Sequence, residues 1–239
     1  MNAIFAEEIA EGWLIVYMDN LLITTKDDIQ SHEKYIHRML ENLRIHDLYL
    51  KLEKCIFEQQ RVKFIGVILE NGMVQMDPAK VKGVADWSPP QNVTDVCSFL
   101  GFTGFYHYFI PNHSLITWPL IQLTWKNTPF LCDWACMHAF KHLKLLMCMK
   151  PILQQSNYTK AFFLATDTSA YGVGTILSQE GELNPRTQKP MLCPVTYYSS
   201  MFTPTERNYN IYEREFLGVL KALKCFRPHV TCHCQGFGQ

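Results

Sequence analysis

The beginning of the chain alternates apolar and polar positions in patterns that predict two strands and a helix. In residues 13–25, two apolar, β-branched runs flank Asp19-Asn20, which is typical of a tight hairpin. Thr25 then stands as a candidate helix N-cap, with Asp28 three residues further on as its partner in a capping box. The helical spacing that follows predicts an inner face made of Ile29, His32, Ile36, Met39 and Leu43.

Two further apolar runs predict a second hairpin. Residues 64–69 and residues 73–76 flank Asn71-Gly72. This dipeptide supplies the two positive φ values that a type I′ turn needs, so the two runs are expected to pair as antiparallel strands.

The middle of the chain is predicted to be helical. Asp77 and Pro78 cap and start one helix. Residues 94–109 and residues 134–149 carry apolar side chains at helical spacing and predict two more helices. The expected inner faces are Phe99, Phe102, Tyr106 and Phe109 for the first, and Cys136, Phe140, Leu143 and Met147 for the second.

The pattern changes at Lys160. Runs with strand character follow in residues 161–167, 171–179 and 194–200. Residues 205–226 then predict a long helix, whose expected buried face consists of Tyr212, Phe216, Val219, Leu220 and Leu223. Helices followed by strands and a final helix indicate an α+β fold, with a candidate domain boundary in residues 150–160.

The composition fits a packed chain, since 48% of the 239 residues are hydrophobic and 18% are charged. Lys plus Arg and Asp plus Glu number 22 each, so no basic excess favours tight, unaided binding of nucleic acid. Nine cysteines without a regular framework favour reduced thiols and an intracellular protein, in the cytoplasm or the nucleus. The sequence contains neither a signal peptide nor an apolar run near the ~18 residues of a membrane span, so no membrane partner is expected.

Asp19 is the first candidate for chemistry, because it is expected at a hairpin tip with Tyr17, Met18 and Asn20. A carboxylate at such a tip can hold a divalent cation at the floor of an active site. The alternative is that Asp-Asn simply favours a turn. By themselves, the four residues favour this second interpretation.

The surrounding motifs change that balance. The stretch VYMDNLLITT resembles the YxDD hairpin of reverse transcriptases. Later stretches resemble gypsy-type LTR retrotransposon Pol polyproteins in the same order: LKLEKCIFEQQRVKFIGVIL, MDPAKVKGVADWSPPQNVTDVCSFLGFTGFYHYFIP, FFLATDTSAYGVGTILSQEG and YYSSMFTPTERNYNIYEREFLGVLKALKCFRPH. The resemblance covers residues 11–230. It implies the C-terminal part of a reverse transcriptase palm in residues 1–76, helical thumb or connection in residues 77–155, and a truncated ribonuclease H-like mixed sheet with one long helix in residues 156–239.

The resemblance also implies a polymerase site. The family takes two aspartates from the hairpin turn and one from an earlier palm strand. Asp19 matches the first of the pair, whereas Asn20 replaces the second and removes a charge. Glu7, Glu8 and Glu11 precede the hairpin, but none of them fits the earlier motif. With one carboxylate of three, this chain is not expected to polymerise DNA by itself.

A ribonuclease H site is implied by Asp167, at the end of the first strand of that domain, and by Glu215 on the long helix. Glu213, on the other side of this helix, is expected to be solvated. The family uses four carboxylates, and the sequence after Phe226 contains no acidic residue, so two remain. The resemblance implies Mg²⁺ or Mn²⁺ as cofactor, with Asp19, Asp167 and Glu215 as metal ligands.

Phe64, Ile65 and Gly66, followed by Val67, resemble the primer grip that positions the 3′ end of a primer. The alternative is a core strand in which the glycine marks a close backbone approach. Both interpretations can hold together.

The helical region departs from the family at several positions. Its aromatic cluster (Phe99, Phe102, Phe105, Tyr106, Tyr108 and Phe109) is expected in the core, with base stacking as the alternative. Cys97, His107 and Trp118 stand where the family commonly has Arg, and each lost phosphate contact lowers affinity for nucleic acid. These changes, like Asn20, can each arise from one transition, which supports the hypothesis of a decaying transposon copy.

Zinc is not expected at Cys132, Cys136, His138 and His142. Positions on one helix advance by about 100° per residue, so the two histidines would lie on a different face from the cysteines. The Cys-His-Cys run in residues 232–234 is too short to predict a site.

Three hypotheses follow. The first is a fragment of a retrotransposon reverse transcriptase and ribonuclease H, whose family activities are RNA-directed DNA synthesis and RNA–DNA hybrid cleavage, itself catalytically deficient. The second is a non-catalytic nucleic-acid-binding or protein-interaction remnant. The third is an active element whose sequence is cut at both ends. The expected partners are an RNA–DNA hybrid or primer–template and the remainder of the Pol polyprotein.

Overall fold

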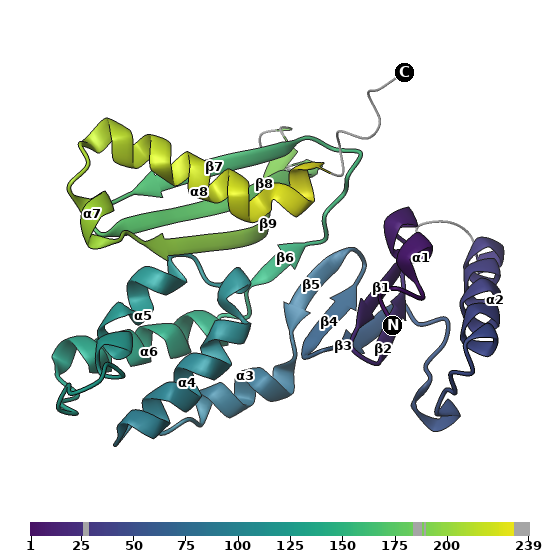
Figure 1. Ribbon diagram of the computed structural model, residues 1–239, viewed down its shortest axis with the longest axis horizontal. Coiled ribbons are helices and arrows are strands. Elements are labelled where there is room, and N and C mark those ends of the chain that lie inside the picture. The colour runs from purple at the N-terminus through teal and green to yellow at the C-terminus, as the bar shows by residue number, and fades with distance from the viewer. Residues whose placement is uncertain (26–28, 184–187, 189, 232–239) are drawn as a thin grey trace. The chain divides into compact units, whose positions relative to one another are not determined.

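The computed structural model describes residues 1–25, 29–183, 188 and 190–231. The chain forms two compact units, Met1–Gln59 and Gln60–Gln239, here called unit 1 and unit 2 (Figure 1). Each unit contains both helices and strands, which confirms the predicted α+β class.

Unit 1 is a hairpin packed with helices. Its elements are α1 (Ala6–Glu11), β1 (Leu14–Tyr17), β2 (Asn20–Ile23), α2 (Ile29–Ile45) and the 3₁₀ helix η1 (Leu52–Lys54). Its core consists of Phe5, Trp13, Leu14, Met39 and Leu43, so α2 packs against β1. Met39 and Leu43 were predicted on the inner face of this helix, whereas Ile29 is exposed. The predicted capping box cannot be followed, because Asp28 lies outside the described residues.

The turn of this hairpin differs from the prediction by one residue. Tyr17 pairs with Asn20, so the two turn residues are Met18 and Asp19 rather than Asp19 and Asn20. Met18 has a φ of 55°, an uncommon conformation for a residue with a bulky side chain. Asn20 is therefore the first residue of β2 and belongs to the paired ladder.

Unit 2 begins with a four-stranded antiparallel sheet. Its strands are β3 (Arg61–Phe64), β4 (Val67–Glu70), β5 (Met73–Met76) and β6 (Ile152–Gln154), in that order across the sheet. The turn at Asn71-Gly72 has φ values of 50° and 71°, as the sequence predicts. The single strand predicted over residues 64–69 is wrong: a turn at Ile65-Gly66, with φ values of 46° and 76°, divides it into β3 and β4.

Helices follow the third strand of this sheet. They are α3 (Pro78–Ala85), α4 (Val93–Phe105), the 3₁₀ helix η2 (His107–Phe109), α5 (His113–Gln122) and α6 (Trp134–Cys148). Asp77 caps α3 through a hydrogen bond from the Ala79 N–H, as predicted. The helix predicted over residues 94–109 ends earlier, because Tyr106 leaves helical geometry with φ −100° and ψ 15°. Sequence periodicity did not predict α5.

The aromatic side chains of this region form the largest core of unit 2. Phe99, Tyr106 and Phe109 are buried, together with Phe140 and Leu143 of α6. The core interpretation of the aromatic cluster is therefore confirmed for these residues. Phe105 and Tyr108 are the exceptions, since about half of each side chain is exposed.

The end of the chain forms a three-stranded antiparallel sheet covered by a helix. The strands are β7 (Phe162–Thr168), β8 (Gly172–Leu183) and β9 (Pro190–Met201), and two helices, α7 (Pro204–Arg207) and α8 (Ile211–Thr231), follow. Figure 1 shows α8 lying across this sheet. The one helix predicted over residues 205–226 is thus two, because Asn210 starts a new helix as its cap.

The face that α8 buries also differs from the prediction. Gly218, Ala222 and Phe226 lie against the sheet. The predicted buried residues Tyr212, Phe216, Leu220 and Leu223 are between 45% and 79% exposed. The small residues Gly218 and Ala222 let the helix lie very close to the strands, and apolar periodicity does not reveal this contact face.

The helical region and the three-stranded sheet are joined within unit 2. The Ser114 N–H donates to Ser199 Oγ at 2.8 Å, and Ser114 Oγ donates to the Ser199 carbonyl at 2.8 Å. The Arg207 guanidinium lies over the rings of Trp118 and Tyr171, at 5.6 Å and 5.8 Å from their centroids. These contacts hold α5 against β9 and the turn between β7 and β8.

Candidate functional site

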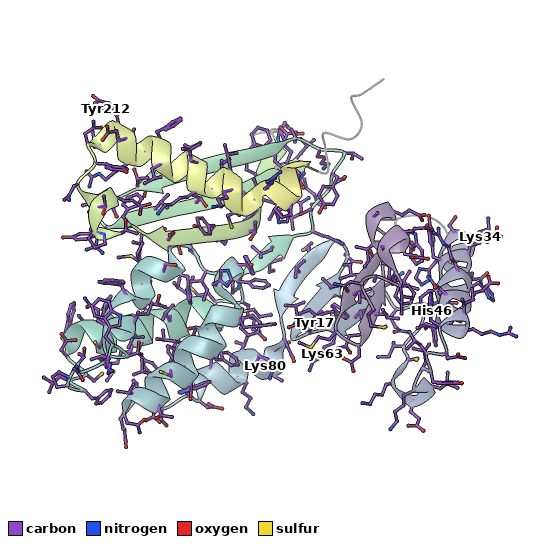
Figure 2. All side chains as sticks on the ribbon, in the orientation of Figure 1. Tyr17, Lys34, His46, Lys63, Lys80 and Tyr212 are labelled. Carbon is purple, nitrogen blue, oxygen red and sulfur yellow. The ribbon has the colours of Figure 1, made fainter. Side chains whose placement is uncertain are left out.

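Asp167 and Glu215 line the same pocket, between the end of β7 and the second turn of α8. The pocket has a volume of about 560 Å³. Its lining consists of Thr166, Asp167, Thr168, Tyr212, Glu215, Phe216 and Val219. Figure 2 labels Tyr212 on α8. The structure therefore brings together the two residues that the ribonuclease H resemblance singled out, and both are exposed to solvent.

Glu213 has a different position from Glu215. Its N–H donates to Asn210 Oδ1 at 2.9 Å, and the Asn210 N–H donates to Glu213 Oε2 at 3.0 Å. This reciprocal pair is a helix-capping arrangement that satisfies free N–H groups at the start of α8. Glu213 therefore has a structural partner, and Glu215 is the carboxylate of this turn that lines the pocket.

Gly218 determines how closely α8 approaches the strands. A Cβ atom at this position would lie 2.7 Å from Thr168 Cγ2 and 3.0 Å from Val173 Cγ2. Residues three positions apart share one side of a helix, so the contact at Gly218 also fixes the distance of Glu215 from β7. Sequence reasoning missed this residue, although a glycine inside a predicted helix is a signal of close packing.

Asp167 also lines a second, smaller pocket of about 200 Å³. This pocket adds Asn112, from the loop before α5, and Tyr197 of β9. A Cβ atom at Gly174, which pairs with Asp167 across the sheet, would overlap the Asn112 amide. The glycine thus lets the loop approach the strand that carries Asp167.

The pair Asp167 and Glu215 fits a divalent cation only in part. Carboxylate oxygens are the ligands that Mg²⁺ prefers, but the two-metal chemistry that the resemblance implies requires a cage of several of them. Within residues 1–25, 29–183, 188 and 190–231, no group of three or more His, Cys, Asp or Glu side chains is placed to hold a metal ion. Among the described residues, Asp167 and Glu215 therefore do not complete such a cage.

Asp19 lies at the exposed tip of the hairpin in unit 1. The acidic residues of α1 are engaged elsewhere: Arg38 lies 2.7 Å from Glu11 and 3.4 Å from Glu8. Hydrogen bonds from Trp13 and Arg38 lower the pKa of the Glu11 carboxyl. Glu8 and Glu11 thus form ion pairs with Arg38. Among the described residues, they do not form a metal-binding carboxylate cluster with Asp19.

The primer-grip-like residues Phe64, Ile65 and Gly66 lie at the turn between β3 and β4. The Gly66 carbonyl accepts hydrogen bonds from the Tyr106 hydroxyl at 3.0 Å and from the Asp77 N–H at 3.1 Å. The close backbone approach expected at this glycine is confirmed, but the segment is a turn rather than the middle of a strand. Sequence reasoning did not identify the hydroxyl and the amide that hold it.

Asp77 is buried beside this turn and pairs with Lys63, whose Nζ lies 2.5 Å from Asp77 Oδ2. The Lys63 ammonium and the Ala79 N–H lower the pKa of the Asp77 carboxyl. The negative charge of Asp77 is therefore stabilised in the folded protein.

The positions where the resemblance suggested lost arginines lie in different surroundings. Cys97 is exposed on α4, whereas His107 and Trp118 are half-buried. The His107 ring nitrogen Nδ1 lies 2.5 Å from the Gly104 carbonyl, and Trp118 contacts Trp125 and Arg207. Two of the three thus have packing roles within unit 2.

The cysteine and histidine residues near α6 have different surroundings. Cys136 Sγ is buried and donates to the Pro119 carbonyl at 3.4 Å, and burial raises the pKa of this thiol to about 12. Cys132 precedes α6 rather than lying on it, and His138 stacks on Trp134. The run at 232–234 lies outside the described residues.

Known proteins resemble this chain over most of its length. Residues 133–235 match the family described as the RNase H-like domain found in reverse transcriptase. The chain is 30% identical over 231 residues to the Transposon Tf2-7 polyprotein of Schizosaccharomyces pombe, a match that covers 96% of this chain and 17% of the relative. It is also 30% identical over 226 residues to the Retrovirus-related Pol polyprotein from transposon opus of Drosophila melanogaster, covering 90% and 22%.

The fold is similar to solved structures of the foamy viral protease-reverse transcriptase. The structure in complex with RNA/DNA hybrid has a TM-score of 0.75 at 18% identity, covering 94% of this chain and 30% of that one. A form named dRH, in complex with double-stranded DNA, has a TM-score of 0.73 at 18% identity, covering 95% and 39%. At this identity the likeness establishes the fold.

Residues 133–235 thus match an RNase H-like domain found in reverse transcriptase, and the chain shares its fold with the foamy viral protease-reverse transcriptase. The resemblance to gypsy-type retrotransposon Pol polyproteins is confirmed, and the chain matches one segment of such polyproteins. It spans about a fifth of the length of the relatives named above. In the described part of the chain, no helix has both the length and the apolar character needed to cross a membrane.

Proposed function

We propose that this chain is a segment of retrotransposon reverse transcriptase and ribonuclease H that engages an RNA–DNA hybrid or a primer–template but completes neither reaction by itself. The observation that carries the proposal is the pocket in which Asp167 and Glu215 supply the two carboxylates. A pocket of about 560 Å³, open to solvent, has room for part of a nucleic-acid strand. Two carboxylates are too few for the two metal ions of family chemistry.

The hairpin of unit 1 supports the proposal that this chain does not complete DNA synthesis by itself. Asp19 is an exposed carboxylate at the tip, and the next residue is the neutral Asn20. An amide supplies one oxygen ligand but no charge, so it compensates less of the charge of a divalent cation than a carboxylate does. In the proposed assembly, the remainder of the Pol polyprotein supplies the missing ligands.

The proposed partners follow from the class. The foamy viral structures named above contain RNA/DNA hybrid or double-stranded DNA. Since Lys plus Arg equals Asp plus Glu in this chain, we expect binding to depend on local contacts and to weaken as salt increases.

Binding of a fluorescein-labelled RNA–DNA hybrid, followed by anisotropy at several salt concentrations, tests this proposal. We expect a saturable signal for the hybrid that falls with salt, and no Asp167-dependent cleavage in the same samples. A folded chain that gives no signal at low salt would contradict the proposal. Such a result would favour a protein-interaction role instead.

A protein-interaction role is the second candidate, favoured by the outer face of α8. Tyr212, Phe216, Leu220 and Leu223 form an exposed apolar stripe along this helix. Exposed apolar patches of this kind mark interaction surfaces in soluble proteins. Concentration-dependent self-association in analytical ultracentrifugation, abolished by Leu220→Glu, would favour this candidate over nucleic-acid binding.

A further inference from the structure

The Gly66 carbonyl connects three parts of unit 2. It belongs to the turn between β3 and β4, and it accepts one hydrogen bond from the Asp77 N–H, which precedes α3. It accepts another from the hydroxyl of Tyr106, which follows α4. Tyr106 is only 2% exposed, so its hydroxyl has been removed from water and depends on this carbonyl as its partner.

The ring of Tyr106 has little freedom to move. Its centroid lies 4.8 Å from that of Phe105, 5.5 Å from that of Phe102 and 6.2 Å from that of Phe109. Aromatic rings at these separations pack in defined tilted and edge-on geometries. The hydroxyl is therefore presented to the turn by a rigid group rather than by a flexible side chain.

The turn is shaped to accept this hydroxyl. A Cβ atom at Gly66 would lie 2.8 Å from Tyr106 Oη, and the other neighbouring atoms would lie at 3.6 Å or more. Gly66 also has a φ of 76°, which favours glycine. Residue 65, an isoleucine with φ 46°, adopts a conformation that is unusual for a β-branched residue. A strained turn of this kind persists only where surrounding contacts hold it.

The surface around the turn has the chemistry of a nucleic-acid contact. Lys63 and Lys80 are exposed, and both are close enough to Asp77 to lower the pKa of its carboxyl. Figure 2 labels these two lysines. Phe105 is 49% exposed, and its Cε1 lies 3.6 Å from the Cβ position at Gly66. Ammonium groups contact phosphates, and exposed aromatic rings stack on bases.

We propose that Tyr106 is a positioning residue that holds the Ile65-Gly66 turn in the shape that contacts a primer–template duplex. The inference rests on the proposed function, since it assumes that unit 2 binds nucleic acid. The hydroxyl acts through the Gly66 carbonyl and does not itself touch the duplex. The exposed groups beside the turn, Lys63, Lys80 and Phe105, make the contacts with phosphates and bases.

Tyr106→Phe removes the hydroxyl and keeps the ring. Tyr108→Phe is the matched control, since it removes a hydroxyl from a ring that is 48% exposed two residues further on. The probe is a labelled RNA–DNA hybrid with a recessed primer end, and the readout is the Kd at a temperature well below unfolding. We expect Tyr106→Phe to raise Kd about fivefold, the loss of one net hydrogen bond, and Tyr108→Phe to leave it unchanged.

A purely structural role would lower the unfolding temperature of Tyr106→Phe but leave the Kd of the folded protein unchanged, and this result would overturn the inference. Wild-type protein that does not bind the hybrid at all would overturn the proposed function, and the inference with it. The two failures are thus distinguished by the wild-type titration alone.

Gly66→Ala provides a second test that does not depend on one variant. Its added methyl group collides with the hydroxyl, and Tyr106→Phe removes that collision. We expect Gly66→Ala to raise the Kd for the hybrid. Tyr106→Phe should then raise this Kd by a smaller factor in the Gly66→Ala background than in wild type. The same factor in both backgrounds would contradict the coupling between the Tyr106 hydroxyl and the turn.

Discussion

Asp167 on β7 and Glu215 on α8 line one pocket because Gly218 allows the helix to lie almost against the strand. The nearest groups, the methyl of Thr168 and that of Val173, belong to β-branched side chains with few alternative rotamers. The pocket therefore depends on a residue that is not itself a candidate for chemistry. Its geometry can be tested without nucleic acid.

Gly218→Ala is expected to destabilise unit 2. Overpacking against Thr168 and Val173 costs about 1–3 kcal/mol, which exceeds the gain of about 1 kcal/mol in helix propensity. The urea midpoint of unfolding measures the net effect. Gly101→Ala on α4 is the matched control, since its Cβ would meet no atom within 4 Å. It is expected to stabilise the protein, and equal midpoints for the two variants would contradict the close approach of α8.

His113 at the start of α5 is expected to make stability depend on pH. Its Nε2 atom is buried without a hydrogen-bond partner among the described residues, and burial, followed by the charge of nearby His107, lowers its pKa to about 4. The unfolded chain takes up this proton near pH 6.5, so between pH 6.5 and 4 it binds more protons than the native state. Stability therefore falls as pH decreases through this interval.

Replacing His113 by Gln tests this pH dependence. Urea unfolding from pH 7.5 to pH 4 should show a smaller loss of stability for His113→Gln, by about 2–3 kcal/mol at the acidic end. Part of the loss remains, because burial also lowers the pKa of His229. A variant with the same pH profile as wild type would show that His113 is not buried in its neutral form.

Asp77→Asn concerns a lower pH interval. The pKa of Asp77 is lowered in the folded protein, so its charge contributes stability above the unfolded value of 3.8, and this stability is lost as pH falls through the folded pKa. Asparagine retains the cap of α3 but loses the attraction to Lys63. We expect Asp77→Asn to have a lower free energy of unfolding than wild type at pH 7, and this free energy to depend less on pH below pH 4. Urea unfolding at several pH values measures both. Lys63→Met should behave in the same way.

Lys80→Gln tests the surface beside the Ile65-Gly66 turn. The loss of one phosphate contact makes the negative slope of the logarithm of the binding constant against the logarithm of salt concentration less steep by about one. Titration of the labelled hybrid at four salt concentrations gives this slope. Lys82→Gln, at an exposed position two residues further along α3, should leave the slope unchanged. The same reduction in both variants would indicate a diffuse charge effect rather than a specific contact.

Much of the fold could be predicted from the sequence where the signal is local. The Asn71-Gly72 turn and the cap at Asp77 are specified by neighbouring residues, and both occur as predicted. Strand β6 was missed because it has only three residues and pairs with β5 from a distant part of the chain. The turn at Ile65-Gly66 was missed because the contact that stabilises it comes from Tyr106.

The candidate site could be predicted in part. Asp167 and Glu215 came from the family resemblance, and the structure places both on one pocket. Their roles, and that of Asp19, stay predictions. Tyr212 and Phe216 were expected in the core, yet they line this pocket with their side chains exposed. Apolar spacing marks a helical face without showing what covers it, whereas the small residues Gly218 and Ala222 mark the face that packs.

The most direct measurement of the central claim is single-turnover cleavage of a labelled RNA–DNA hybrid in Mg²⁺ and in Mn²⁺. The wild-type chain is compared with Asp167→Asn and Glu215→Gln, each shown to be folded and to bind the hybrid. We expect binding in all three samples and no cleavage above the Asp167→Asn background. Cleavage by the wild type that disappears in both variants would show that these two carboxylates suffice, and would contradict the proposed deficiency.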